Sequence, residues 1–144
     1  MRKSRSNNMN PGAGAKFEKA VQKYFLLKHK LALNNQVSFK LGVGKVKKLH
    51  RFDLASVKDR VIVECKSYTW TAGGNSPSAK FGFLNEVMFY FHLAPKSYRK
   101  LLVMRNHTRK SLSLAQHYIK NHKHLFAKKV EVWELAGSKA ERIF

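Results

Sequence analysis

The stretch RFDLASVKDRVIVECKSY, residues 51–68, decides how this chain is expected to fold. Its apolar run Val61–Cys65 has strong β propensity and follows a polar turn at Lys58–Arg60. We expect a preceding strand over about Leu49–Val57, so that the two strands pair across the turn. The stretch also holds three of the chain's 8 Asp and Glu, although the formal charge is +21.

Side chains on a strand alternate between its two faces, which puts Glu64 and Lys66 on one face of the Val61–Cys65 strand and its end. The opposite face is wholly apolar and is expected to meet a helix, with Cys65 as a small core residue. The turn would bring Asp53 across from the end of this strand. The two carboxyl groups and the ammonium group are therefore expected to share one site.

Hydrophobic spacing elsewhere predicts further helices and strands in alternation. Helices are expected at Ala15–Leu31, at Lys80–Pro95 and from Ser111 to His122, and strands at Asn34–Gly44, Lys100–Arg105 and Lys128–Leu135. The order is one helix, a three-stranded meander, a helix, a strand, a helix and a strand. It predicts an α/β fold with a mixed central sheet flanked by helices. We expect a flexible basic tail over 1–14 and a single domain over 15–144.

The charge predicts the class of partner. The 144 residues carry 29 Lys and Arg against 8 Asp and Glu, with a sequence pI of about 10.4, so a polyanion, above all DNA, is the expected partner. No apolar run approaches the roughly 20 residues of a membrane-spanning helix, and no signal peptide is evident at the start. With the single cysteine, Cys65, no internal disulfide can form, which suits a cytoplasmic protein.

Two carboxylates in one site suggest a metal ion. Holding Asp53 and Glu64 a few ångströms apart costs free energy unless a cation lies between them, and their hard oxygen atoms favour Mg²⁺ or Mn²⁺. Lys66 beside them could hold an attacking water and offset the negative charge that builds on a phosphate. The trio therefore predicts phosphodiester hydrolysis.

Asp53 followed by Glu64-Cys65-Lys66 resembles the motif of the PD-(D/E)xK nuclease superfamily, which includes Holliday-junction resolvases and homing endonucleases. The resemblance covers roughly Ala15–Arg105 and implies a restriction-endonuclease-like αβββαβ core and a metal-dependent DNA endonuclease. It also implies that Glu18, which matches an acid on the family's first helix, assists catalysis and metal binding. Phe52 stands where the family's motif has a proline.

Several residues are candidates for contact with nucleic acid. Lysines suit the phosphate backbone, while aromatic rings beside the site could stack on bases. The candidates are Lys45, Lys47, Lys48, Arg51, Tyr68 and Trp70, with His50 and Asn75 as further candidates for sequence preference. A duplex has two strands, so we expect a homodimer, and the segment 80–95, which is apolar on nearly every side, is the candidate interface. Burial of this segment inside the monomer stays open as the alternative.

Other interpretations of the same residues stay open. Glu64 and Lys66 could be a solvated pair on an exposed face, Asp53 could serve only a turn, and Glu18 could form an ordinary helix-surface salt bridge. Trp70 could fill a gap under the Gly-rich loop at 71–79. Glu86 could take the place of Glu18. The alternative function is that of a basic nucleic-acid-binding protein without catalysis, and a membrane-surface binder is a third.

Overall fold

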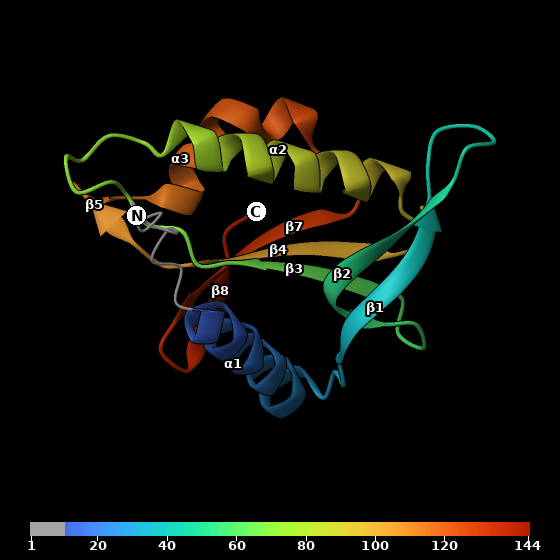
Figure 1. Cartoon of the computed structure of the whole chain (residues 1–144). Coiled ribbons are helices and arrows are strands. Elements are labelled where there is room, and N and C mark those ends of the chain that lie inside the picture. Colours follow the sequence, from blue (N-terminus) through green and yellow to red (C-terminus); the bar gives the residue numbers. More distant parts are fainter. Residues whose placement is uncertain (1–10) are drawn as a thin grey trace, which may run out of the picture.

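The computed structural model describes residues 11–144 and places one mixed β-sheet between helices on both of its faces (Figure 1). The helices are α1 (Pro11–His29), α2 (Ser78–Leu93), α3 (Leu114–His122) and the short 3-10 helix η1 (Lys123–Leu125). The strands are β1 (Asn34–Leu41), β2 (Lys48–Ser56), β3 (Val61–Lys66), β4 (Arg99–Arg105), β5 (Thr108–Arg109), β6 (Leu112–Ser113), β7 (Val130–Ala136) and β8 (Lys139–Arg142). The expected α/β class and the order of its main elements are confirmed.

The six-stranded sheet has the order β1-β2-β3-β4-β7-β8. The meander β1-β2-β3 is antiparallel, β4 and β7 run parallel to β3, and β8 returns antiparallel along β7. The parallel neighbours β3 and β4 are joined through α2, and β4 and β7 through α3, as parallel pairs require a crossover. The short strands β5 and β6 form a separate hairpin.

Strand β3 lies at the centre of the sheet, and its two faces contribute to two separate cores. Val63 and Cys65 pack with Val21 and Phe25 of α1, whereas Ile62 packs in the core on the α2 and α3 side. The predicted alternation of β3 is therefore confirmed. Burial of one such aliphatic or aromatic side chain contributes about 1.5–3 kcal/mol, so β3 is fixed from both sides.

Helix α2 buries most of its apolar surface inside the monomer, which is the alternative to a dimer interface that its sequence left open. Its first apolar stripe, Phe81, Leu84, Met88 and Phe91, is buried against the sheet. In the second stripe Val87 is buried and Tyr90 half-buried, while Phe83 remains 51% exposed. The monomer thus covers most of the apolar surface that had suggested a dimer interface on this helix.

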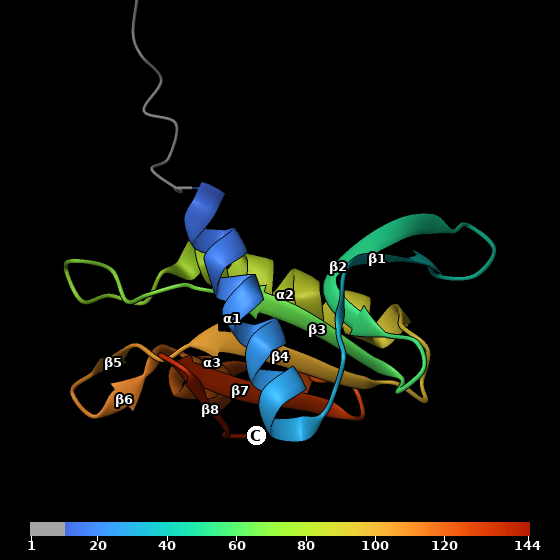
Figure 2. The same ribbon diagram turned by 90° about the horizontal axis from the view of Figure 1, so that it is seen from below.

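Strands β2 and β3 part at Asp53. Their paired residues end at Leu54 with Val63, although β3 continues to Lys66. Phe52 belongs to the core under α2, whereas Leu54, two residues later, belongs to the core over α1, so the regular alternation breaks between them. Opposite the break Gln36 has φ of 52°. From there the β1-β2 hairpin extends away from the sheet, as Figure 2 shows.

Several element boundaries differ from the expected ones. Helix α1 begins at Pro11, so residues 11–14 are helical and do not belong to a tail, and the rest of the expected tail lies outside the described residues. Strand β1 ends at Leu41, because the following residues turn: Gly44 has φ of 65°, and a Cβ at Gly42 would lie 2.0 Å from the carbonyl oxygen of Val46.

Helix α3 begins at Leu114, three residues later than expected. Ser113 caps it, since its hydroxyl accepts from the backbone of Gln116 while the Gln116 side chain accepts from the backbone of Ser113. The strands β5, β6 and β8 were not expected, because runs of only two to four residues carry little hydrophobic pattern.

Candidate active site

Asp53 lies at the point where β2 and β3 separate, and its carboxylate is hydrogen-bonded to the backbone of β3. Its Oδ2 accepts a hydrogen bond of 2.8 Å from the backbone N–H of Cys65. The bond holds Asp53 beside the C-terminal end of β3, as the turn at 58–60 predicts. Because the sheet is open at this point, both the α1 side and the α2 side can reach the Asp53 carboxylate.

Glu64 projects from β3 toward α2 and is 6% exposed. Burial and the negative charge of Asp53 raise the pKa of Glu64 to about 9, against the opposing effect of the Lys66 ammonium. Glu64 is therefore protonated at neutral pH in the metal-free protein. A solvated Glu64–Lys66 surface pair is excluded, because a surface carboxylate would not be buried in this way.

Lys66 ends β3 and is half-buried at the mouth of a cavity of about 480 Å³. The same cavity is lined by Asp53 and Glu64 from the sheet and by Tyr68 from the following loop. The Lys66 ammonium lies 6.0 Å from the centre of the Tyr68 ring. The structure therefore brings the predicted trio and Tyr68 together around one open space.

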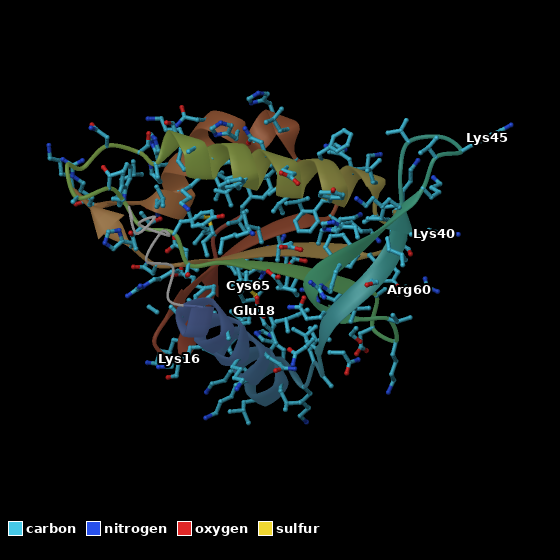
Figure 3. All side chains as sticks on the ribbon, viewed as in Figure 1. Lys16, Glu18, Lys40, Lys45, Arg60 and Cys65 are labelled. Carbon is cyan, nitrogen blue, oxygen red and sulfur yellow. The ribbon has the colours of Figure 1, made fainter. Side chains whose placement is uncertain are left out.

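Glu18 approaches the Asp53 carboxylate from α1, on the other side of the sheet. Its side chain is half-buried, and burial together with the charge of Asp53 raises its pKa. Figure 3 shows Glu18 on α1 next to Cys65, whose thiol pKa is raised by burial and also by the charges of Asp53 and Glu18. Gln36 of β1 donates a hydrogen bond of 3.5 Å to Glu18. Glu18 does not line the cavity, so its contact with the site runs through Asp53.

Helix α2 supplies the opposite wall, including Glu86, the alternative candidate to Glu18. Glu86 and Tyr90 line the cavity. The Tyr90 ring stacks on His50 of β2 at a centroid distance of 3.6 Å. His50 Nε2 lies 4.0 Å from Glu64, yet burial lowers the pKa of His50, so at neutral pH both partners are uncharged and the contact is not an ion pair.

The predicted basic contacts lie on the β1-β2 hairpin. Lys47 and Lys48 line a neighbouring cavity between the hairpin and α2, and Arg51 lines both cavities. Lys47 is also bonded within the turn, where its Nζ donates to the carbonyl of Gly42 at 2.7 Å. Lys45 projects from the tip of the hairpin, as Figure 3 shows.

Trp70 and Asn75 are held away from the trio. The Trp70 ring packs beside His117 of α3, and its backbone N–H donates to His107 at 2.9 Å. Asn75 is bonded to Thr71 within the Gly-rich loop. Neither residue lines the cavity of the trio, and Trp70 packs instead against the core on the α2 and α3 side.

Sequence reasoning gave His50 only a minor role and did not identify Tyr90 as a wall of the site. His50 and Phe52 alternate on β2, a pattern that could have shown that His50 faces the same core as Phe52. The contact of Tyr90 depends on how α2 crosses the hairpin, for which no local pattern exists.

Two carboxyl groups from this chain would suffice for a magnesium site. Within residues 11–144 no cluster of three or more His, Cys, Asp and Glu side chains is arranged to hold a metal ion. Mg²⁺ keeps several of its waters and is commonly bound through one or two carboxylates, so Asp53 and Glu64 fit it, provided that Glu64 loses its proton.

Comparisons with protein-family models, with curated proteins and with solved structures each gave no match. None of the helices described here is long and apolar enough to cross a membrane.

Proposed function

We propose that this protein is a divalent-metal-dependent DNA endonuclease of the PD-(D/E)xK type. One observation carries the proposal: the bond from the Cys65 N–H to Asp53 places Asp53, the buried Glu64 and Lys66 around one cavity in a strongly basic chain. Burying an acid beside another acid is costly, so a protein that keeps both gains something from the pair.

The arrangement of elements supports the restriction-endonuclease-like core. Helix α1, the antiparallel meander β1-β2-β3, helix α2 and the parallel strand β4 follow one another in the αβββαβ order that the resemblance implies. The two acids lie on the second and third strands of that meander. Asp53 stands where these strands separate, and Glu64 lies on the third strand beside it. This likeness is one of topology and motif position.

The proposed reaction is hydrolysis of a phosphodiester bond. Asp53 and Glu64 would hold Mg²⁺ or Mn²⁺, and the ion when bound would supply Lewis-acid chemistry for the hydrolysis. Lys66 orients the attacking water and offsets the charge that develops on the phosphate oxygens. Glu18 acts as a positioning residue through its contact with Asp53.

DNA is the proposed partner, and the β1-β2 hairpin is the proposed surface that binds its phosphates. Lys47, Lys48 and Arg51 line the two cavities, and Lys45 projects from the tip of the same hairpin, so these cations can neutralise phosphates. Cleavage of both strands of a duplex requires two active sites, so we also propose that a homodimer forms on DNA.

Plasmid cleavage tests the proposal. Supercoiled plasmid and branched DNA are incubated with the protein and Mg²⁺, Mn²⁺ or chelator, beside Asp53→Asn, Glu64→Gln and Lys66→Met. We expect each substitution to lower the rate by at least about 100-fold, since even outer partners of a metal site are worth 10- to 100-fold. The control is Glu141→Gln, because Glu141 is an exposed acid on β8. Cleavage that persists in chelator would rule out this mechanism.

A second candidate function is DNA binding without catalysis. It is favoured by the pKa of Glu64, because a carboxyl group with a pKa of about 9 is neutral at pH 7 and can remain buried without a metal ion. Under this alternative the protein binds DNA in chelator, Mg²⁺ weakens the binding only as a competing cation does, and none of the substrates above is cut.

A further inference from the structure

A groove runs from the candidate active site along the space between the β1-β2 hairpin and α2. It consists of the cavity of about 480 Å³ around the trio and a neighbouring cavity of about 460 Å³. The two cavities share the wall residues His50, Arg51, Glu86 and Tyr90. Each is in the range of about 300–1,000 Å³ that encloses a drug-sized ligand, which is the size of one or two nucleotides.

The two walls of the groove differ in charge. The hairpin wall carries Lys47, Lys48 and Arg51, whereas α2 contributes one acid, Glu86, among the described residues that line the two cavities. A polyanion lying in the groove would therefore turn its phosphates toward the hairpin. Its other side would face α2, where Glu86 can accept a hydrogen bond from a base amino group.

The α2 wall also presents two exposed aromatic rings. Phe83 lines the cavity of the trio and is 51% exposed, and Phe89 lines the neighbouring cavity and is 55% exposed. Glu86 lies three residues from each ring, so it neighbours both of them on the helix surface. The rings are about 9 Å apart along the helix axis, whereas stacked bases are about 3.4 Å apart, so only an unstacked strand would place one base on each ring.

We propose that this groove binds a single DNA strand that has separated from its duplex and guides it to the trio. Basic side chains on one wall and exposed aromatic rings on the other are the combination that proteins use for single strands, with phosphates on the cations and bases on the rings. The inference rests on the proposed function for its choice of DNA, and it adds the substrate class: forked, flapped or otherwise branched DNA.

A second copy of this chain is a poorer occupant for the groove. Each copy has a formal charge of +21, and the hairpin wall is itself basic. Two such surfaces would repel each other unless an anion lay between them. A DNA strand satisfies both the charge of the hairpin and the apolar rings of α2.

Fluorescence anisotropy in chelator tests the groove without cleavage. The probes are an oligothymidylate of about 20 nucleotides, longer than the site of one such groove, and a duplex of similar length. We expect Phe83→Ala and Phe89→Ala each to weaken single-strand binding at least about five-fold and duplex binding less than about two-fold. The control is Leu27→Ala, since Leu27 is 65% exposed on α1, across the sheet.

The salt dependence of binding tests the hairpin wall, which is expected to contact the phosphates. Replacing Lys48 and Arg51 by Ala should reduce the slope of log affinity for the single strand against log salt by about 0.7 for each lost phosphate contact. The matched control replaces Lys23 and Lys28, exposed lysines of α1, and should leave the slope unchanged. Thermal unfolding confirms that each variant is folded.

Three outcomes would overturn the inference: single-strand binding that the Phe variants leave unchanged, equal losses on strand and duplex, or Phe variants that only convert a dimer into a monomer. The outcomes also separate the two proposals. The expected binding pattern without any Mg²⁺-dependent cleavage supports the groove and refutes the endonuclease. Cleavage that requires Asp53 and is indifferent to both rings supports the endonuclease and refutes the groove.

Discussion

The backbone N–H of Cys65 donates a 2.8 Å hydrogen bond to Oδ2 of Asp53, at the point where β2 and β3 separate. The carboxylate thus supplies an acceptor to a strand N–H that lies beyond the last paired residues of the two strands. The same bond fixes Asp53 next to Glu64. A single contact therefore links the opening of the sheet to the position of the candidate metal ligand.

We expect Asp53→Asn to be more stable than Asp53→Ala by about 1–2 kcal/mol. Both substitutions remove the charge, whereas only Asn keeps a side-chain oxygen that can accept from the Cys65 N–H. Urea unfolding of the two variants in chelator measures the difference. Equal stabilities would mean that the bond to Cys65 adds nothing to the fold.

The raised pKa of Glu64 predicts that the metal-free protein loses stability as the pH rises. The folded pKa is about 9 against an ordinary value of 4.5, so between these values the folded state holds a proton that the unfolded state has lost. The free energy of unfolding therefore falls from about pH 4.5 to about pH 9, by on the order of a few kcal/mol for this group.

Glu64→Gln should remove this part of the pH dependence. The variant cannot ionise, so it should exceed the wild type in stability at about pH 8 and differ little from it at about pH 5. Urea unfolding in chelator at the two pH values provides the measurement, and Glu141→Gln, an exposed acid on β8, is the control. A variant less stable than the wild type at both pH values would contradict the assignment of the raised pKa.

Metal binding should favour the ionised form of Glu64 and so offset the free energy that its ionisation costs. Because a carboxylate ligand must be deprotonated, Mg²⁺ binding at pH 7 should release close to one proton and tighten as the pH rises toward about 9. A concentration ten times the dissociation constant should stabilise the protein by about 1.4 kcal/mol. Titration calorimetry in buffers of different ionisation enthalpy counts the proton.

Asp53→Asn and Glu64→Gln are the variants that should lose this Mg²⁺ response, and Glu86→Gln should keep it because Glu86 lies on the α2 wall. An unfolding temperature that Mg²⁺ shifts equally in the wild type and in all three variants would place the ion elsewhere on the protein.

The sequence predicted those parts of the site that depend on local pattern. Alternation in the Val61–Cys65 run was sufficient to place Glu64 on the opposite face from Cys65, and the turn at 58–60 was sufficient to bring Asp53 near the end of β3. Both relations depend on residues within one hairpin, where the period of a strand decides which side chains share a face.

The remaining features depend on contacts that no local pattern encodes. The stacking of His50 on Tyr90 joins residues 40 positions apart through the packing of α2 on the hairpin. The pKa of Glu64 depends on how deeply the side chain is buried. The break at Asp53 depends on the positive φ of Gln36 on the neighbouring strand. Such features follow from tertiary packing, which overrides local preference.

The two carboxyl groups should differ in their effect on DNA binding in chelator at pH 7. Asp53→Asn removes an acidic group that faces the incoming phosphate and should tighten binding up to about five-fold, the equivalent of about 1 kcal/mol at contact distance in water. Glu64→Gln should change the affinity little, because Glu64 is already neutral at this pH. At about pH 9.5 Glu64 is ionised, so there Glu64→Gln should also tighten binding. Anisotropy with a catalytically inert phosphorothioate oligonucleotide checks both values, and equal effects of the two variants at pH 7 would show that Glu64 carries its charge in the free protein.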